Sequence, residues 1–302
     1  MNGATPTITG LTLAIIGCGT MGSAILAGVM ESCVQTEARG EEPTISRFIA
    51  TVSSSESAQA LRLRFAKYRV KPWLEVLEKD NVTGMREADI VMLACKPYMA
   101  STVLSTPCVR ESLAGKLVVS VLVGSPADKL ESFIYHASPK GDDERRIYIK
   151  RVMLNIAAEH GASMSVIETP AEPVPQYMED ITSWMFLQVG KTAPVAPELF
   201  DIGGIIAGPS SAFLSVALDG ILDGAVSEGL KRADARKMLT QSMVSLTKLL
   251  ESGEHPAVLR EKYSSPKGTT IAGLLSLEED RVRYAFSKAV IKSSKRSEEI
   301  GK

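Results

Sequence analysis

The sequence predicts an α/β fold, with an N-terminal doubly wound parallel sheet followed by a C-terminal all-helical domain. Three observations support this expectation. A short apolar run, Leu11–Ile16, ends abruptly in spaced glycines and leads into a helical pattern. Strand-like apolar stretches then alternate with helical ones as far as Val166, which is typical of parallel strands joined by helices. Beyond Val195, apolar residues recur only at helical spacing.

Length and composition narrow the possible classes of protein. A chain of 302 residues is long for one core, and we expect two domains, residues 1–195 and 196–302. A net charge of −1 offers no electrostatic footprint for nucleic acid or for an anionic membrane surface. The four cysteines and three histidines are scattered without metal-ligand spacing, so we expect no metal site and a reducing, cytoplasmic location. No uninterrupted apolar run reaches membrane-spanning length.

The first strand leads into the motif Gly17-Cys18-Gly19-Thr20-Met21-Gly22. Gly17 permits a tight turn, Gly19 lets a pyrophosphate approach the backbone, and Gly22 lets the next helix pack closely on the strand. That helix is expected from Thr20 to Glu31, with the N–H groups of its first turn facing the phosphates. The motif therefore predicts a dinucleotide site. The alternative is a strand-turn-helix whose glycines serve packing only.

The second strand predicts which dinucleotide binds. After a polar stretch, Val34–Ser46, expected to be a surface loop, we expect this strand at Phe48–Val52, followed by Ser53-Ser54-Ser55 and a helix. A cofactor without the 2′-phosphate usually meets an Asp or Glu at this point. Hydroxyls stand here instead, and Arg62 or Arg64 could add positive charge, which favours NADPH. The alternative is that the serines only cap the helix.

The third apolar run, Asp89–Cys95, must stop at Lys96-Pro97, because proline cannot continue a strand ladder. Ligands of a doubly wound sheet lie beyond the carboxyl ends of its strands, so Ala94, Lys96 and Pro97 are expected beside the cofactor. Further strands and one helix are expected at Leu117–Val123, Pro126–Tyr135 (the helix), Arg151–Asn155 and Ala162–Val166.

The C-terminal part contains two unusual stretches. Ser210–Leu230 is apolar on much of its circumference, which predicts a helix buried inside the domain or against a partner subunit. In Tyr263–Glu278, hydroxyls, Pro and Gly precede a helix whose first turn holds Thr269 and Thr270. Free N–H groups and hydroxyls at such a helix start can bind a carboxylate. A plain capped helix is the alternative.

The chain resembles the pyrroline-5-carboxylate reductase family over nearly its whole length. The most specific match is to the family's C-terminal signature, which is similar to Ser265–Leu274, Leu277-Glu278, Ala289-Val290 and Arg296-Ser297. The family's opening turn, its Lys-Pro dipeptide, its adenosine-side asparagine, its dimer-forming helices and its His-Pro dipeptide are similar to Gly17–Gly22, Lys96-Pro97, Asn81, Asp201–Leu230 and His255-Pro256.

The resemblance implies a Rossmann-type NADP-binding domain at 1–195 and a helical dimerisation and substrate-binding domain at 196–302. The implied reaction is the NADPH-dependent reduction of the C=N bond of 1-pyrroline-5-carboxylate to L-proline, with NADH as a possible second cofactor. The implied assembly is a homodimer or a higher homo-oligomer. The residues expected to bind the cofactor are Gly17, Cys18, Gly19, Thr20, Met21, Gly22, Ser53, Ser54, Asn81, Ala94, Lys96 and Pro97. Those expected to bind substrate are Asn155, Ser265, Lys267, Gly268, Thr269 and Thr270, with the Thr270 hydroxyl as the catalytic group at the substrate nitrogen.

Three departures from the family pattern bear on the substrate. Met153–Ala157 keeps only Asn155 of the polar part of the family's Met-Pro-Asn-Thr-Pro, Gly208–Ala212 differs from the family's Gly-Ser-Gly-Pro-Ala turn, and Lys267 replaces a glycine of the signature. One alternative is therefore a reductase of another cyclic imine, such as a six-membered imino acid or an intermediate of specialised metabolism. A second alternative is a regulator that binds NADPH without turnover.

Overall fold

The structure is a computed structural model that describes residues 8–68, 74–136, 145–169 and 172–301. Its contacts divide the chain into unit 1, Met1–Gly208 with Ser294–Lys302, and unit 2, Pro209–Ser293. This division lies later than the boundary at 195/196 expected from composition. The reason is that helix α8 (Phe200–Ala207) packs against a strand of the sheet and so joins unit 1.

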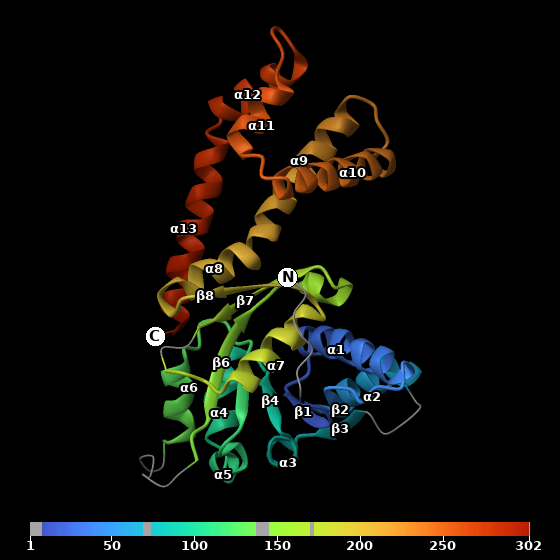
Figure 1. Cartoon of the computed structure of the whole chain (residues 1–302). Helices are drawn as coiled ribbons and strands as arrows, with labels where there is room; N and C mark the ends of the chain where they lie inside the picture. Colours follow the sequence, from blue (N-terminus) through green and yellow to red (C-terminus); the bar gives the residue numbers. More distant parts are fainter. Residues whose placement is uncertain (1–7, 69–73, 137–144, 170–171, 302) are drawn as a thin grey trace. The chain divides into compact units, whose positions relative to one another are not determined.

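An eight-stranded sheet organises unit 1 (Figure 1). The strand order is β3-β2-β1-β4-β5-β6-β7-β8, and the first six strands in this order form five parallel pairs, as expected of a doubly wound parallel sheet. The order reverses direction between β1 and β4, which is where ligands of such sheets bind. The strands are β1 (Leu11–Ile16), β2 (Ile45–Val52), β3 (Leu74–Glu78), β4 (Ile90–Leu93), β5 (Leu117–Ser120), β6 (Tyr148–Met153), β7 (Ser163–Glu168) and β8 (Gly190–Val195).

The sheet is not parallel throughout. Strand β7 runs antiparallel to β6, and β8 runs parallel to β7. The connection between β6 and β7 is short, residues 154–162, and it contains one 3-10 helix, η3 (Ile156–His160). A parallel crossover needs a longer connection, so the chain turns back instead.

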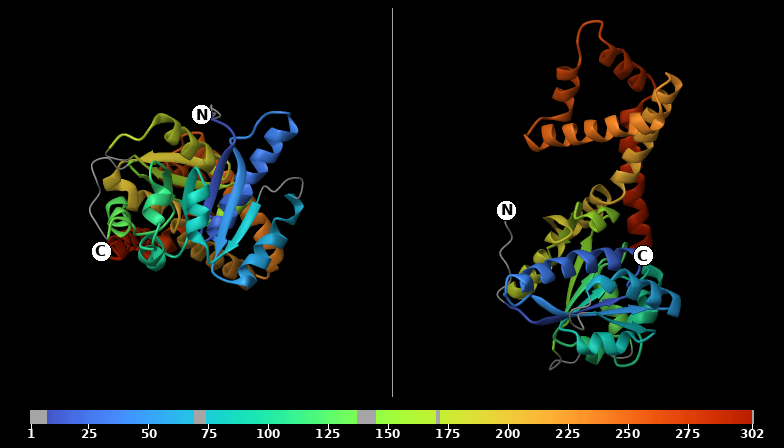
Figure 2. Two further views of the ribbon diagram at one scale, coloured as in Figure 1. Left: turned by 90° about the horizontal axis from the view of Figure 1, so that it is seen from below. Right: turned by 90° about the vertical axis from the view of Figure 1, so that its right-hand side faces the viewer.

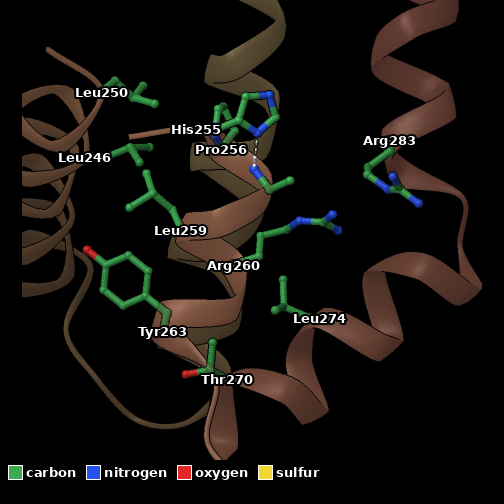
Figure 3. Close-up of a pocket in the computed structure, with 11 residues that line it drawn as sticks. Leu246, Leu250, His255, Pro256, Leu259, Arg260, Tyr263, Thr270, Leu274 and Arg283 are labelled. Carbon is green, nitrogen blue, oxygen red and sulfur yellow. Dashed lines mark hydrogen bonds between the residues drawn. The ribbon is translucent and has the colours of Figure 1, made fainter. Parts of the chain in front are cut away.

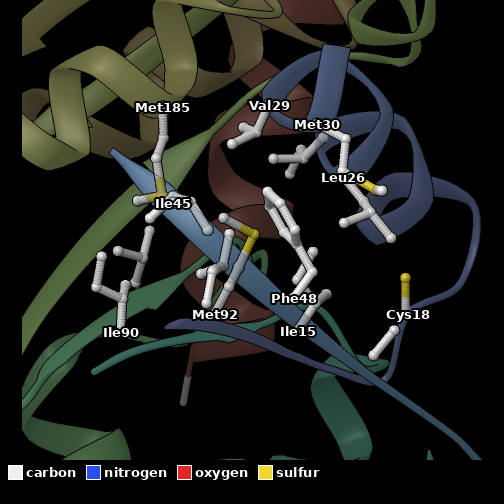
Figure 4. Close-up of a cluster of buried hydrophobic side chains, with 14 of the residues drawn as sticks. Ile15, Cys18, Leu26, Val29, Met30, Ile45, Phe48, Ile90, Met92 and Met185 are labelled. Carbon is white, nitrogen blue, oxygen red and sulfur yellow. The ribbon is translucent and has the colours of Figure 1, made fainter. Parts of the chain in front are cut away.

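Helices cover both faces of the sheet. Leu13 and Ile15 of β1 belong to one buried cluster, which includes side chains of α1 and α7 (Figure 4), whereas Ala14 and Ile16 belong to a second cluster with α3 to α6. This alternation is that of a strand buried on both faces. In the right-hand view of Figure 2, α1 (blue) lies on one side of the sheet and the teal helices lie on the other. The helices are α1 (Thr20–Ala38), α2 (Ser55–Arg64), α3 (Asn81–Glu87), α4 (Ala100–Leu104), α5 (Val109–Leu113), α6 (Ala127–Ile134) and α7 (Gln176–Leu187).

Helix α1 is longer than its sequence pattern predicts. It continues past Glu31 to Ala38, so the first part of the expected loop Val34–Ser46 is helical. The helix ends just before Gly40, which adopts φ +78°. Glycine takes this left-handed conformation without steric cost, which makes it a common residue just beyond a helix end.

A buried polar cluster in unit 1 joins four elements. The Arg151 guanidinium on β6 donates to Glu168 on β7 at 2.9 Å and to Asp201 on α8 at 3.5 Å. The Ser297 hydroxyl, on the last turns of α13 (Val282–Gly301), donates to the same Asp201 carboxylate at 3.2 Å. Burial raises the pKa of Glu168, and the Arg151 charge opposes that rise. Because each charge has a partner, the cluster ties residues 294–301 to the sheet.

Unit 2 is all-helical, as predicted, and it lacks a closed core. Of its residues only Ala235 and Leu259 are buried, while many large apolar side chains are exposed, among them Val216 and Tyr284. Its helices are α9 (Ser210–Ser227), α10 (Arg232–Glu251), α11 (Pro256–Tyr263), α12 (Thr269–Glu279) and the first part of α13. Exposed apolar faces of this extent are typical of an interaction surface.

The apolar segment Pro197–Ser227, which includes α8 and α9, is long enough and apolar enough to cross a membrane by length and composition alone. The expectation drawn from uninterrupted apolar runs did not single out this segment, because Asp201, Asp219 and Asp223 interrupt it. An apolar helix of this kind also suits a subunit interface.

Candidate functional site

Two of the three glycines in the first turn are required by the fold, and one leaves open space. Gly17 has φ +75°, and a Cβ there would lie 2.6 Å from the Cα of Cys95. A Cβ at Gly22 would lie 3.2 Å from the Cβ of Ala94. A Cβ at Gly19 would meet nothing closer than a backbone oxygen at 4.0 Å. Gly19 therefore matches a backbone position that a ligand can approach closely.

Helix α1 begins directly after this open position. Its N-cap is Gly19, no side chain caps it, and Thr20 is exposed. The N–H groups of Thr20, Met21 and Gly22 face no described hydrogen-bond acceptor, as expected in the first turn of a helix, so they can bind a phosphate. Burial raises the pKa of the Cys18 thiol to about 12, and the Arg64 charge lowers it slightly. Cys18 is thus a neutral packing residue in this turn.

A hydrogen-bond chain joins this turn to Asn81. The Gly17 N–H donates to the Thr51 hydroxyl at 3.1 Å, and that hydroxyl donates to Oδ1 of Asn81 at 2.6 Å. The Cys18 N–H donates to the Thr51 carbonyl at 2.8 Å. Thr51, at the end of β2, therefore fixes both the glycine turn and the first residue of α3. The sequence did not single out Thr51, because a threonine in a strand carries no local signal of this role.

The serines after β2 are engaged within the protein. The Ser54 hydroxyl accepts from the Ser57 N–H at 3.2 Å, so Ser54 is the N-cap of α2, which is the alternative that the sequence left open. The Ser55 hydroxyl donates to the Glu78 carboxylate at 2.9 and 2.8 Å. Ser53 is exposed. Of the predicted hydroxyl donors, Ser53 is the one without a described hydrogen bond.

The two arginines expected beside the serines point elsewhere. Arg62 donates to the Val76 carbonyl at 2.9 Å, and Arg64 donates to the Ser23 hydroxyl at 3.1 Å and to Glu159 at 2.9 Å. The expectation that they add charge at the serines is therefore not met. A guanidinium on a helix face is directed by its tertiary partners, which a linear sequence does not reveal.

The end of β4 lies beside the end of β1, as a ligand-binding crevice requires. The Ala94 N–H donates to the Ile16 carbonyl at 2.9 Å, immediately before the glycine turn. Lys96 is exposed, and Pro97 begins the short 3-10 helix η2 (Pro97–Met99). The structure thus brings together Gly17–Gly22, Asn81, Ala94, Lys96 and Pro97 at the carboxyl edge of the sheet.

Asn155, expected at the substrate, uses its side chain within unit 1. Its Oδ1 accepts from the Ala157 N–H at 2.9 Å, and its Nδ2 donates to the Ala207 carbonyl at 2.6 Å. The side chain therefore joins the end of β6 to the end of α8. Its role toward a substrate stays a prediction.

The second predicted anion site lies in unit 2, at the start of α12. The Gly268 N–H donates to the Ser265 carbonyl at 2.9 Å, so this N–H, expected at a carboxylate, is already used. No side chain caps the helix at Gly268, and the N–H groups of Thr269 and Thr270 have no described acceptor. Lys267 has φ +58°, a left-handed conformation that is uncommon for a residue with a Cβ.

Thr270 lines a groove of about 620 Å³ within unit 2 (Figure 3). The close-up shows Thr270 at the start of α12, near Tyr263 of α11 and Leu274 of α12. Arg260 and Arg283 also line the groove, and both bond the Glu278 carboxylate, which holds the pKa of Glu278 below its ordinary value. The other lining residues are Leu246, Leu250, His255, Pro256, Ala257 and Leu259.

Comparison with known proteins gives concordant matches to both halves of the chain. A family model described as pyrroline-5-carboxylate reductase dimerisation matches residues 197–300, and one described as NADP oxidoreductase, coenzyme F420-dependent, matches residues 12–124. The pyrroline-5-carboxylate reductase of Lophium arboricola is 35% identical over 302 residues, covering 97% of this chain and 94% of that one. The enzyme of the same name from Neurospora crassa is 35% identical, covering 93% of this chain and 90% of that one.

The fold also matches a solved structure. The pyrroline carboxylate reductase of Plasmodium falciparum, solved with NADP bound, aligns with a TM-score of 0.79 at 21% identity. The alignment covers 98% of this chain and 100% of that one. At this identity the match shows a shared fold.

Proposed function

The chain belongs to the pyrroline-5-carboxylate reductase family and is an NAD(P)-dependent oxidoreductase of that type, and from this premise we propose that it reduces the C=N bond of 1-pyrroline-5-carboxylate to give L-proline, with NADPH as cofactor. The observation that carries the proposal is the uncapped start of α12, where Thr270 lines a groove and the nearby N–H groups have no described acceptor. We infer a role in proline biosynthesis in a reducing, cytoplasmic compartment, which the four free cysteines favour.

The proposed imine reduction needs few acid or base side chains. When bound, the reduced nicotinamide would supply a hydride, that is, one proton with two electrons, to the imine carbon. A protonated imine already accepts this hydride, and its nitrogen keeps the proton in the amine product. The Thr270 hydroxyl has no described hydrogen bond, so it is available to the ring nitrogen. The N–H groups of Thr269 and Thr270 would hold the substrate carboxylate.

The glycine turn of unit 1 supports the cofactor part of the proposal. The open backbone at Gly19 and the first-turn N–H groups of α1 suit a pyrophosphate. Asn81, oriented by Thr51, suits the adenosine ribose. Ser53 and backbone N–H groups at the start of α2 suit a 2′-phosphate, with NADH as a weaker second cofactor. Reduction requires the nicotinamide and the imine carbon to be in contact.

We propose a homodimer or a higher homo-oligomer, built through the helices from about residue 205 to residue 250. The family model that covers this range, at residues 197–300, is one of dimerisation. The exposed apolar side chains of unit 2 and the apolar segment Pro197–Ser227 supply the surface that such an interface buries.

A second substrate class is favoured by two departures from the family pattern. Lys267 stands in a left-handed turn of the proposed substrate site, and a residue is held in such a conformation only when its surroundings support it. An added ammonium and the altered Met153–Ala157 stretch suit a different cyclic imino acid, for example one with a six-membered ring. A protein that binds NADPH without turnover is the remaining alternative.

One experiment separates these proposals. Purified protein is supplied with NADPH and a series of five- and six-membered cyclic imino acids, and NADPH oxidation is followed by absorbance. We expect the highest kcat/KM with 1-pyrroline-5-carboxylate. A preference for a six-membered ring would overturn the proposal that 1-pyrroline-5-carboxylate is the substrate. No NADPH oxidation with any cyclic imine would refute the proposed reductase activity.

Two variants then test the proposed catalytic hydroxyl. A hydrogen bond to a charged group is worth about 1.5–3 kcal/mol, so Thr270→Ala should lower kcat by roughly 10- to 150-fold and leave NADPH affinity unchanged. Thr269→Ala is the matched control, because it is the neighbouring threonine in the same helical turn. Normal turnover by the Thr270→Ala enzyme would remove this residue from catalysis.

A further inference from the structure

Two neighbouring residues of opposite charge lie beside the start of α2. Glu78, the last residue of β3, pairs in register with Val52, the last residue of β2. The N–H of Lys79 donates to the Val52 carbonyl at 2.9 Å. Val52 directly precedes Ser53, so both charged residues lie where an adenosine ribose would meet the fold.

Lys79 is held there in an uncommon conformation. Its φ is +55°, in the left-handed region that residues with a Cβ rarely adopt. The side chain is exposed, and its ammonium has no hydrogen bond or ion pair with any part of the chain that the structure describes. Because Arg62 and Arg64 are bonded elsewhere, Lys79 is a cation available to an anion beside Ser53.

Glu78 has the opposite chemistry. Its carboxylate accepts both hydrogen bonds from the Ser55 hydroxyl, at 2.9 and 2.8 Å, in the first turn of α2. A carboxylate in this position repels a phosphate and competes with it for the same donor. It can instead accept from the free 2′-hydroxyl of an adenosine ribose, which is the role that an acidic residue plays in NAD-binding folds.

We propose that Glu78 and Lys79 together set the cofactor preference, with Lys79 binding the 2′-phosphate of NADPH and Glu78 accepting from the 2′-hydroxyl of NADH. This inference rests on the cofactor part of the proposed function. The pair would let a site whose serines and arginines are mostly engaged discriminate between the two dinucleotides. Each residue acts on one cofactor, so their removal shifts the preference in opposite directions.

The test measures dissociation constants of NADPH and NADH by calorimetry, without any imine present. Lys79→Gln should weaken NADPH about tenfold, the loss of one charge-assisted hydrogen bond, and leave NADH unchanged. Glu78→Gln should strengthen NADPH about threefold and weaken NADH. Lys79→Arg should restore most of the NADPH affinity. Raising the salt concentration should weaken NADPH binding more in the wild-type protein than in Lys79→Gln.

A backbone control and the adenosine fragments sharpen the result. Lys79→Gly relieves the left-handed conformation while removing the charge, so it should bind NADPH as weakly as Lys79→Gln. The fragments 2′,5′-ADP and 5′-AMP should repeat the pattern of NADPH and NADH. Equal effects of Lys79→Gln on both cofactors, or no effect on either, would overturn the inference. A wild-type protein that shows the expected binding pattern but reduces no cyclic imine would refute the proposed reaction and leave this inference standing.

Discussion

Replacing Gly19 by alanine should weaken NADPH binding without harming the fold. Gly19 has φ −85° and an extended ψ, which alanine also adopts, and its Cβ would meet no protein atom closer than 4.0 Å. The melting temperature of the cofactor-free protein should therefore stay the same or rise slightly, because alanine restricts the unfolded chain. The Cβ would occupy the space that we propose for the pyrophosphate, and the loss of one charged hydrogen bond, worth about 1.5–3 kcal/mol, should weaken NADPH binding roughly 10- to 150-fold.

Gly17→Ala is the contrasting variant. An alanine at φ +75° costs about 1–2 kcal/mol, and a Cβ placed 2.6 Å from the Cα of Cys95 adds roughly 1–3 kcal/mol because backbone must move. A total of about 3 kcal/mol lowers the melting temperature by roughly 6–12 °C in a unit of this size. Both variants are melted with and without NADPH, and the dissociation constant is measured by titration. Wild-type NADPH affinity in Gly19→Ala, or an unchanged melting temperature in Gly17→Ala, would refute this division of roles.

Three further predictions concern other parts of the chain. Light scattering should find a dimer or larger species, and a stable monomer at micromolar concentration would contradict the proposed interface. Lys267→Gly removes an ammonium and relieves a left-handed turn, so KM for the imino acid should rise while the free energy of unfolding stays equal or increases by about 1 kcal/mol. Iodoacetamide near neutral pH should label exposed Cys108 before Cys18, whose thiol has a pKa of about 12, and mass spectrometry of peptides measures the order. Labelling of Cys18 before Cys108 would contradict this prediction.

The interior of the sheet was predictable from the sequence, and its edges were not. The strands β1, β4 and β5 are buried on both faces, so each reads as a nearly continuous apolar run. Strand β3 has the sequence Leu-Glu-Val-Leu-Glu, and β8 contains Lys191 and Pro194. Both are edge strands, where charges and proline are tolerated and the apolar signal is weak.

In the candidate site, too, local features were predictable from the sequence and features that depend on distant partners were not. The glycine turn was predictable because its conformation is a local property of Gly17 and Gly19. The roles of Thr51 and Asn155 depend on partners far along the chain, Asn81 and Ala207, which no local pattern reveals. Side-chain direction decides these cases, and it is set by tertiary packing.

The return of α13 to unit 1 has a consequence for how the protein is made. A ribosome completes Arg151 and Asp201 and then all of unit 2 before Ser297 emerges, yet Ser297 bonds Asp201 within unit 1. Unit 1 therefore acquires its last hydrogen bonds only after unit 2 has been synthesised, and that closure spans a long separation along the chain. A fragment ending at Gly208 would lack this contact, so such a fragment is not a faithful substitute for unit 1 in nucleotide-binding experiments.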